Sequence, residues 1–322
     1  MEPITITARN FARIMEEQVE PFLAQHRSEG FVIAKDGAHI HYEAYIRSDS
    51  VGGVVISHGF TEAAEKFREV SYRFYARGYS VFAIDHRGHG RSDRAVDGYY
   101  LTHVDKFADY VDDFERFIDQ VALPNNGAKP LYLYAHSMGG AIGALFLSRR
   151  PEVFARAVLT APMIQPVTRP FPRRMGQAMG AAMCALGRGK RRVAHYPGAF
   201  NPQESFEKSC DTCRERFDYY LKKRVATPQL QNGAPTYSWA RQAMGVTDTL
   251  LKPENAARIA CPVLLLQADG DHVVEPEAQR RFVALLKQGE LVRMENCKHE
   301  IYMSTDDVLE TYYRRIFDFL EK

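Results

Sequence analysis

Hydrophobic and polar positions follow two different periods along the first 46 residues. Residues 8–25 repeat at helical spacing, which predicts an amphipathic helix. Its apolar stripe consists of Phe11, Ile14, Met15 and Val19, followed by Pro21. Two strand-like segments come next, GFVIAK and HIHYEAYI, and the Asp36-Gly37 pair between them is typical of a hairpin turn.

From residue 52 onward, short apolar runs alternate with helical stretches. The runs are GGVVISH, YSVFAID, LYLYAH and RAVLTA. Such unbroken apolar runs are typical of strands that are buried on both faces. Helical periodicity lies between them, at about 65–76, 103–121 and 139–150. The alternation predicts an α/β protein with a mostly parallel sheet covered by helices.

The alternation stops at Pro162 and resumes after residue 250. Residues 163–250 contain helix-like stretches, prolines and many basic residues, but no clear buried strand. The series then continues with the strand CPVLLLQA, a helix at about 276–287, the strand ELVRME and a helix at about 306–322. We therefore expect a core made of 1–162 and 251–322, with a mainly helical cap, 163–250, inserted after the sixth core strand.

Composition narrows the class of protein. The 322 residues are 45% hydrophobic and 25% charged, as in ordinary globular proteins, and the formal net charge of +2 gives no reason to expect nucleic acid as a partner. Five scattered cysteines fit a reducing compartment better than a disulfide framework. No apolar leader and no run of about 20 apolar residues is present, so we expect a cytoplasmic protein that can touch a membrane surface.

The segment YLYAHSMGGA, 132–141, places a serine at a strand-to-helix turn. A nucleophilic serine on such a turn occupies a strained backbone conformation, and the residues two before and two after it must be small. Ala135 and Gly139 meet that requirement around Ser137, and the helix N-terminus adds free N–H groups. The alternative is a serine that only caps the helix. The position after the fifth core strand favours the nucleophile.

A serine nucleophile needs a base and an orienting acid, and in this fold they follow the serine in the order acid, then histidine. The loop after the strand that follows the insertion offers Asp269 and Asp271, and the sequence DHVVEP favours Asp271. The loop after the last strand offers His299. Asp269 stays open as the alternative acid.

The oxyanion of an acyl-transfer intermediate needs backbone N–H donors. The loop after the third strand, His58-Gly59-Phe60, predicts the N–H of Phe60 as one donor, and Met138, after the nucleophile, predicts the other. The motif DHRGHGRS, 85–92, is interpreted as a structural loop. Cys210 and Cys213 have helical spacing and no second pair, so no metal site and no cofactor is predicted.

The insertion is strongly basic. Between 163 and 245, fourteen basic residues stand against five acidic ones, an excess of nine positive charges, whereas the rest of the chain has a formal net charge of −7. A Met- and Ala-rich stretch, 175–187, precedes the densest basic run, 188–192. Such a cap could bind an anionic membrane and admit an acyl chain, or it could present a solvated basic face.

These motifs together resemble a known family. IDHRGHGRS, DKFADYVDDFERF, LYAHSMGGAI, LTAPM, GAPTYSWARQ and LLLQADGDHVV are similar to the inner-membrane lysophospholipases of Gram-negative bacteria, within the monoglyceride lipase-like α/β-hydrolases. The resemblance covers nearly the whole chain. The turn around the serine in that family is similar to the turn here, with Ala135 two residues before Ser137. It implies hydrolysis of the carboxylic ester of lysophospholipids, with acyl transfer to another lipid as a further activity.

The sequence thus predicts a serine hydrolase in which Ser137 attacks the ester, His299 is the base and Asp271 orients it. The first alternative is a monoacylglycerol lipase or general carboxylesterase with the same three residues. A different reaction on the same fold is disfavoured because such relatives usually have aspartate in place of Ser137. A non-catalytic binding protein is the remaining alternative.

Overall fold

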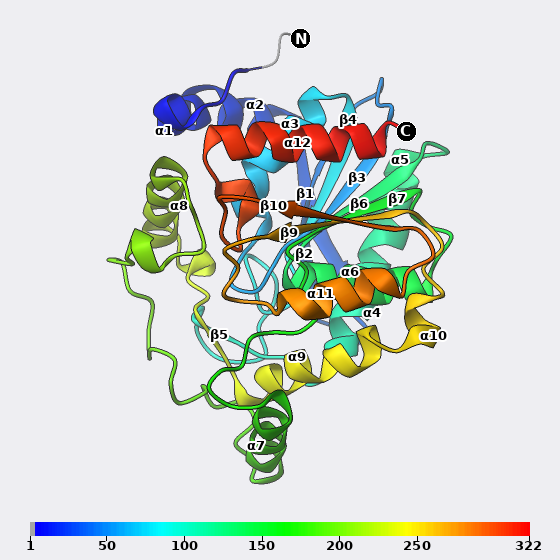
Figure 1. Ribbon diagram of the computed structural model, residues 1–322. Coiled ribbons are helices and arrows are strands. Elements are labelled where there is room, and N and C mark those ends of the chain that lie inside the picture. Colours follow the sequence, from blue (N-terminus) through cyan, green and yellow to red (C-terminus); the bar gives the residue numbers. More distant parts are fainter. Residues whose placement is uncertain (1–3) are drawn as a thin grey trace.

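Eight strands form one mixed sheet at the centre of the computed structural model, which describes residues 4–322 (Figure 1). Their spatial order is β1-β2-β4-β3-β6-β7-β9-β10, with β1–β2 and β2–β4 antiparallel and the other pairs parallel. The strands are β1 (Arg27–Ile33), β2 (His39–Tyr45), β3 (Gly52–Ser57), β4 (Tyr79–Ile84), β6 (Leu131–His136), β7 (Arg156–Thr160), β9 (Val263–Ala268) and β10 (Gly289–Met294). The predicted α/β class is confirmed.

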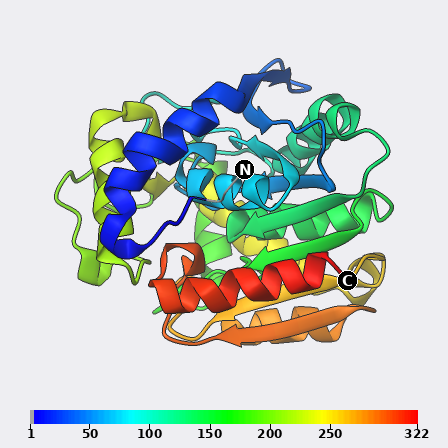
Figure 2. The same cartoon turned by 90° about the horizontal axis from the view of Figure 1, so that it is seen from above.

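Helices cover both faces of this sheet (Figures 1 and 2). Side chains of the central strands alternate between the faces, so Val55 joins one buried apolar cluster while Val54 and Ile56 join the other. The first cluster includes residues from α4 (Phe107–Phe117), α6 (Met138–Arg149) and α11 (Pro276–Ala284), and the second includes residues from α3 (Arg68–Ala76) and α12 (Asp306–Leu320).

The predicted N-terminal helix runs without a break through Pro21. A 3-10 turn and α1 (Phe11–Ile14) lead into a π-helical turn, Met15–Val19, and then α2 (Glu20–His26). Proline has no N–H to donate, and Pro21 sits in the first turn of α2, where that donor is dispensable. The wider π turn therefore lets the helix continue past the proline.

Some predicted bounds were wrong for identifiable reasons. β1 begins at Arg27 and not at Gly30, because it pairs with β2 along its full length. The helix expected from His103 begins at Phe107, continues through a π turn and ends with α5 (Leu123–Asn126). Its expected first turn is extended instead, since Thr102 accepts a hydrogen bond from Thr236 N at 3.0 Å.

The insertion does contain a buried strand, contrary to the prediction. β8 (Ala234–Pro235) pairs in parallel with β5 (Leu101–Thr102) as a separate two-stranded sheet. Two residues are too few to show a sequence period. The helical interpretation of the cysteine pair was also wrong, because Cys210 precedes the helix and Cys213 is its N-cap.

The loop after β4 has the structural role that the sequence indicated. Asp85 Oδ2 lies 2.8 Å from Nδ1 of His41, and Asp85 Oδ1 accepts the N–H of Ala64 at 2.7 Å. Gly90 adopts φ +51°, and a Cβ there would lie 2.3 Å from the Asp85 carboxyl carbon. Arg87 donates to Asp113 at 2.5 Å. The loop is thus built around buried charged side chains.

The segment between β7 and β9 contributes three longer helices, α7 (Arg173–Ala185), α8 (Arg214–Ala226) and α9 (Tyr237–Leu250), before the short α10 (Pro253–Ala256). α9 buries Trp239 and Val246 in the same apolar cluster as α4 and α6. α8 lies beside the N-terminal helix (Figure 2), where Lys222 pairs with Glu16 at 2.8 Å. α7 extends away from the sheet (Figure 1). The division into core and cap remains a prediction.

Candidate active site

Ser137 sits between β6 and α6 in a strained conformation. Its φ of 51° and ψ of −117° lie outside the regions that non-glycine residues normally occupy. Neighbouring backbone holds the turn, because Ser137 N donates to Thr160 O at 3.2 Å and Met163 N donates to Ser137 O at 2.8 Å. Strain maintained by surrounding structure is typical of a nucleophile elbow.

The need for glycine after Ser137 has a different origin from the one expected. A Cβ at Gly139 would lie 2.2 Å from the carbonyl oxygen of Ser57, at the end of the neighbouring strand β3. Crowding by β3, and not by Ala135, therefore requires the glycine. Ala135 is accommodated because it faces Gly143, where an added Cβ would be 3.4 Å from the alanine Cβ. The sequence reasoning missed this role of Gly143.

The structure brings three of the predicted residues into one chain of hydrogen bonds. His299 Nε2 lies 2.8 Å from Ser137 Oγ, and His299 Nδ1 lies 2.7 Å from Asp271 Oδ2. The other carboxylate oxygen, Oδ1, accepts the N–H groups of Val273 and Val274 at 2.8 and 3.1 Å. Because these N–H groups fix the carboxylate, it orients the imidazole with Nδ1 protonated and Nε2 free to accept the serine proton.

Asp269 lies outside this chain. Its carboxylate accepts the N–H groups of Asn296 and Cys297, each at 3.2 Å. Asn296 has φ of 58°, so these bonds support a tight turn at the start of the loop that contains His299. Asp269 therefore shapes the histidine loop without touching the histidine.

The charges at the site support proton transfer to His299. Burial of His299 opposes its protonation, but the Asp271 carboxylate outweighs burial and raises the pKa of the imidazole. Burial would raise the pKa of Asp271, yet the histidine and the two backbone N–H groups hold it below its ordinary value. A base whose protonated form is stabilised can take the proton of a serine hydroxyl.

The loop at His58, Gly59 and Phe60 packs directly on the elbow. A Cβ at Gly59 would lie 2.9 Å from the Cβ of Ser137. Gly59 N donates to Glu62 Oε2 at 2.6 Å, and His58 donates from Nδ1 to Gly59 O at 2.7 Å while its Nε2 accepts the N–H of His86. These bonds fix the loop, and the sequence reasoning did not identify Glu62.

The two predicted oxyanion donors have free N–H groups in the described part of the chain. Neither Phe60 N nor Met138 N donates to an acceptor within residues 4–322. Met138 N is the first N–H of α6, where the helix dipole is positive. Both groups are thus available to a substrate oxygen.

An apolar cavity of about 370 Å³ lies beside this loop, beneath α7. Trp239 lines it and also packs against the Phe60 ring, with centroids 4.0 Å apart and the ring planes tilted by 32°. The cavity wall is joined to the acid loop as well, because Val167 N donates to Val273 O at 2.8 Å. The sequence analysis contained Trp239 only within the motif GAPTYSWARQ and assigned it no role.

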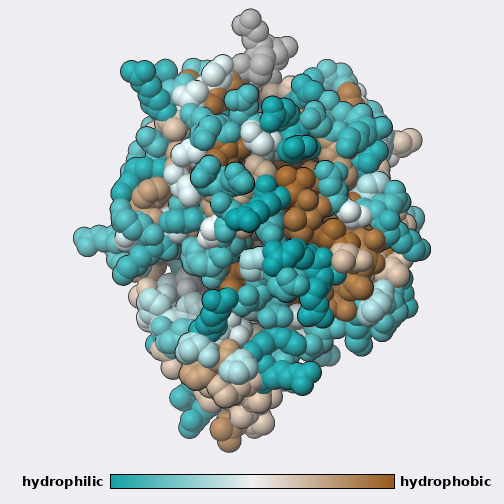
Figure 3. Space-filling model, viewed as in Figure 1, coloured by the Kyte–Doolittle hydropathy of each residue, from teal (hydrophilic) through white to brown (hydrophobic). Residues whose placement is uncertain are grey.

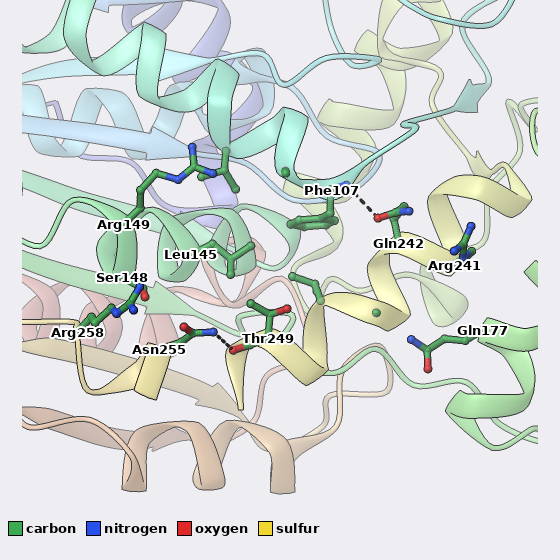
Figure 4. Close-up of a pocket in the computed structure, with 14 residues that line it drawn as sticks. Phe107, Leu145, Ser148, Arg149, Gln177, Arg241, Gln242, Thr249, Asn255 and Arg258 are labelled. Carbon is green, nitrogen blue, oxygen red and sulfur yellow. Dashed lines mark hydrogen bonds between the residues drawn. The ribbon is translucent and has the colours of Figure 1, made fainter. Parts of the chain in front are cut away.

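A larger, polar cavity of about 670 Å³ lies elsewhere, between α4, α6 and α9 (Figure 4). None of Ser137, Asp271 and His299 lines it. Of its arginines, Arg149 is already paired with Asp112 at 2.5 Å. This groove is therefore separate from the candidate active site.

Residues 4–322 contain no group of three or more His, Cys, Asp or Glu side chains arranged to hold a metal ion. All five cysteines are free thiols. The arrangement of Ser137, His299 and Asp271 has the geometry for nucleophilic attack by a serine on a carbonyl.

Comparison with known proteins gives a consistent result. Residues 48–306 match the family model described as serine aminopeptidase, S33. Lysophospholipase L2 of Escherichia coli (strain K12) is 34% identical over 84% of this chain and 80% of its own length. The monoacylglycerol lipase of Mycolicibacterium smegmatis is 27% identical over 80% of this chain and 84% of its own length.

A solved structure shows the same fold. It is a soluble variant of the monoglyceride lipase of Saccharomyces cerevisiae in complex with a substrate analog, with a TM-score of 0.70 and 19% identity. The match covers 92% of this chain and 96% of the yeast one. The two chains therefore share a fold.

Proposed function

The chain belongs to the serine aminopeptidase S33 family of α/β-hydrolases, in its lysophospholipase and monoglyceride lipase branch, and from this premise we propose that Ser137, His299 and Asp271 hydrolyse the carboxylic ester of lysophospholipids. The chain is a carboxylic ester hydrolase. The observation that supports the mechanism most directly is the continuous hydrogen-bond chain of 2.8 and 2.7 Å between the three side chains.

The reaction proceeds through a covalent intermediate. Ser137 Oγ attacks the ester carbonyl carbon while its proton passes to Nε2 of His299. The N–H groups of Phe60 and Met138 stabilise the oxyanion. The intermediate collapses, and the departing glycerol oxygen takes the proton from His299. Water then attacks the acyl-enzyme while His299 takes its proton; the ester bond to Ser137 breaks, Oγ recovers the proton from His299 and the fatty acid leaves. A lipid hydroxyl in place of water gives acyl transfer.

The apolar cavity beside Phe60 supports a long-chain substrate. It is lined mainly by apolar side chains, among them Phe171, Met179, Trp239 and Met244. Burial of an alkyl chain there contributes roughly 0.8 kcal/mol for each methylene group removed from water. We therefore place the acyl chain in this cavity.

The head group separates the two candidate substrates. A lysophospholipid has a phosphate that a monoacylglycerol lacks, and the basic cap favours the phosphate. The purified protein should hydrolyse a lysophospholipid with a kcat/KM about tenfold or more above that for the monoacylglycerol of the same chain, since a charge-assisted hydrogen bond contributes about 1.5–3 kcal/mol. Equal or reversed values indicate a monoacylglycerol lipase, and turnover of only a short p-nitrophenyl ester indicates a general carboxylesterase.

Much of the positive charge of the cap is neutralised within the protein. On α8, Arg216 pairs with Glu69 at 2.9 Å, and Lys223 pairs with Glu65 at 3.1 Å. Arg224 pairs with Glu204 at 2.5 Å. These ion pairs explain much of the charge segregation seen in the sequence. On α7, Arg173 also pairs with Asp248 at 2.5 Å, so Arg174 and the segment 188–192 are left as the free basic surface.

That free surface also exposes apolar side chains. Exposed fractions are 53% for Phe171, 49% for Met175, 48% for Met179 and 69% for Leu186. Figure 3 shows hydrophobic and hydrophilic surface mixed at the lower tip, over α7. Apolar side chains bordered by cations are typical of a surface that rests on anionic lipid. No helix in residues 4–322 is long and apolar enough to span a bilayer.

Three exposed arginines test this membrane contact. Arg174, Arg188 and Arg191 are exposed, whereas Lys190 and Arg192 donate to backbone carbonyls and are left unchanged. Replacing all three with glutamine should weaken binding to anionic vesicles about 100-fold at low salt, because each cation near the surface contributes about 1 kcal/mol. Vesicle co-sedimentation at low and high salt measures the change.

A matched variant carries glutamine at three exposed arginines of the core, Arg281, Arg293 and Arg314. It removes the same net charge and should bind vesicles nearly as wild type does. Equal weakening in both variants would mean that net charge, and not the α7 surface, determines binding. If the wild-type protein does not co-sediment with anionic vesicles at low salt, the basic face is only solvated.

A further inference from the structure

The loop that contains His299 is joined to the cap segment just before α8. Three hydrogen bonds connect them, Glu300 N to Cys210 O at 3.1 Å, Cys213 N to Met303 O at 3.1 Å and Lys298 Nζ to Ser209 O at 3.1 Å. The two segments are far apart in the sequence. The position of His299 is therefore coupled to the position of this part of the cap.

Two carboxyl groups with little exposure to solvent meet at the centre of this contact. Asp211 is 5% exposed and follows Cys210, whose carbonyl oxygen accepts the N–H of Glu300, the residue after His299; this bond brings the two carboxyl side chains together. Asp211 Oδ1 has no donor among the described residues. Ionised carboxylates only accept hydrogen bonds, so two of them in contact require one shared proton.

Lys66 determines which carboxyl is ionised. Its ammonium group donates to Glu300 Oε2 at 2.5 Å and has no such bond to Asp211. Glu300 is therefore the charged partner, and Asp211 holds the proton and donates it to Glu300. Burial and the Glu300 charge raise the pKa of Asp211 well above its ordinary value, whereas Lys66 overcomes burial and lowers the pKa of Glu300.

Other titratable groups surround the pair on every side. They are Glu62 from the oxyanion loop, His136 from the end of β6, Tyr220 from α8, and Cys210, His299 and Tyr302 from the two joined segments. Glu62 lies 3.3 Å from Lys66. Lys66 is the cation that the carboxyl groups of Glu62, Asp211 and Glu300 share, so a further negative charge at Asp211 has little to balance it.

We propose that Asp211 is a positioning residue of the cap, whose protonated carboxyl, bonded to Glu300, holds the cap segment 205–213 on the loop of His299 and releases it on deprotonation. The inference rests on the proposed role of His299 as the base. A carboxyl whose pKa is raised in the folded state stabilises that state fully below its ordinary pKa, and the stabilisation is lost as the pH rises through the raised value. The contact between the cap segment 205–213 and the loop of His299 is thus tight below the raised pKa of Asp211 and loosens above it.

The pH profile of a short soluble ester tests the proposal. Wild-type kcat/KM should fall on the acid side as His299 becomes protonated, and on the alkaline side as Asp211 loses its proton. Asp211→Asn keeps an N–H donor to Glu300 but cannot ionise, so its alkaline fall should vanish. Asp211→Ala has no donor and should be about tenfold or more below wild type at the optimum, as expected for a lost hydrogen bond to a charged group.

Asp218→Asn is the control, because this α8 carboxylate is 58% exposed and lies 3.9 Å from its nearest cation. Its profile should follow that of wild type. An Asp211→Asn variant that keeps the alkaline fall, or an Asp211→Ala variant with the wild-type profile, overturns the proposal.

Hydrogen exchange gives a second, independent measurement. After correction for the intrinsic rate, the amides of Cys213 and Glu300 should lose protection as the pH rises, and they should keep it in Asp211→Asn. Protection that does not depend on pH overturns the proposal. A fluorophosphonate probe on Ser137 reports separately on the proposed function, since its failure to label would refute the serine mechanism without changing the exchange result.

Discussion

Ser137→Ala should lose ester hydrolysis, with kcat falling by about 10⁴- to 10⁶-fold, while the fold remains intact. The substitution removes only Oγ, the atom that His299 Nε2 contacts at 2.8 Å. The strained φ of 51° is imposed by the bonds of the backbone to Thr160 and Met163, so the elbow keeps its shape. Turnover of a lysophospholipid and of a short ester measures the loss, and thermal unfolding checks the fold.

Ser148→Ala is the matched control, because Ser148 lies on the same helix, α6, and lines the separate polar groove of Figure 4. It should keep wild-type activity. Retention of more than about a tenth of wild-type turnover by Ser137→Ala would remove Ser137 from the mechanism, since the binding groups alone do not supply that rate.

Asp271→Asn should lower kcat by roughly 10³- to 10⁴-fold. An amide at this position can present an N–H to His299 Nδ1, which favours the tautomer whose Nε2 is protonated and unable to accept the serine proton. Asp269→Asn should cost far less activity, because the Asp269 carboxylate holds only backbone N–H groups of the turn before His299. Both variants are assayed on the same soluble ester.

A lower stability of Asp269→Asn without a comparable loss of kcat would fit its place in the turn. The reverse ranking of the two activities would make Asp269 the orienting acid. The comparison isolates the contact with His299, because Asp269 and Asp271 are both aspartates in one loop and only Asp271 contacts the histidine.

Local patterns in the sequence were sufficient for much of the fold. Apolar runs and helical periods repeat over short distances, so the order of strands and helices and the turn at Ser137 could be predicted. The residues alone favoured Asp271 over Asp269 but left Asp269 open as the acid. It depends on how the turn is closed, with Gly270 N donating to Cys297 O at 3.0 Å across two distant segments.

Charge was the least predictable property. The basic residues of α8 looked available for a membrane, yet Arg216 binds Glu69 and Lys222 binds Glu16, each far away in the sequence. Composition records how much charge a segment has, but pairing depends on which elements lie side by side. The carboxyl contact of Asp211 with Glu300 was hidden for the same reason.

The unequal anchoring of the cap has a consequence for how this enzyme can diversify. α8 is fixed by ion pairs to the N-terminal helix and α3, and α9 is fixed by its apolar face and by the bond of Trp239 Nε1 to Tyr110 OH at 3.1 Å. α7 extends from the body of the molecule and lines the cavity assigned to the acyl chain. Within segment 168–188, α7 is joined to α9 by the ion pair of Arg173 with Asp248 at 2.5 Å. We therefore expect substitutions at the exposed positions of this segment to change substrate range with little effect on the hydrolytic core.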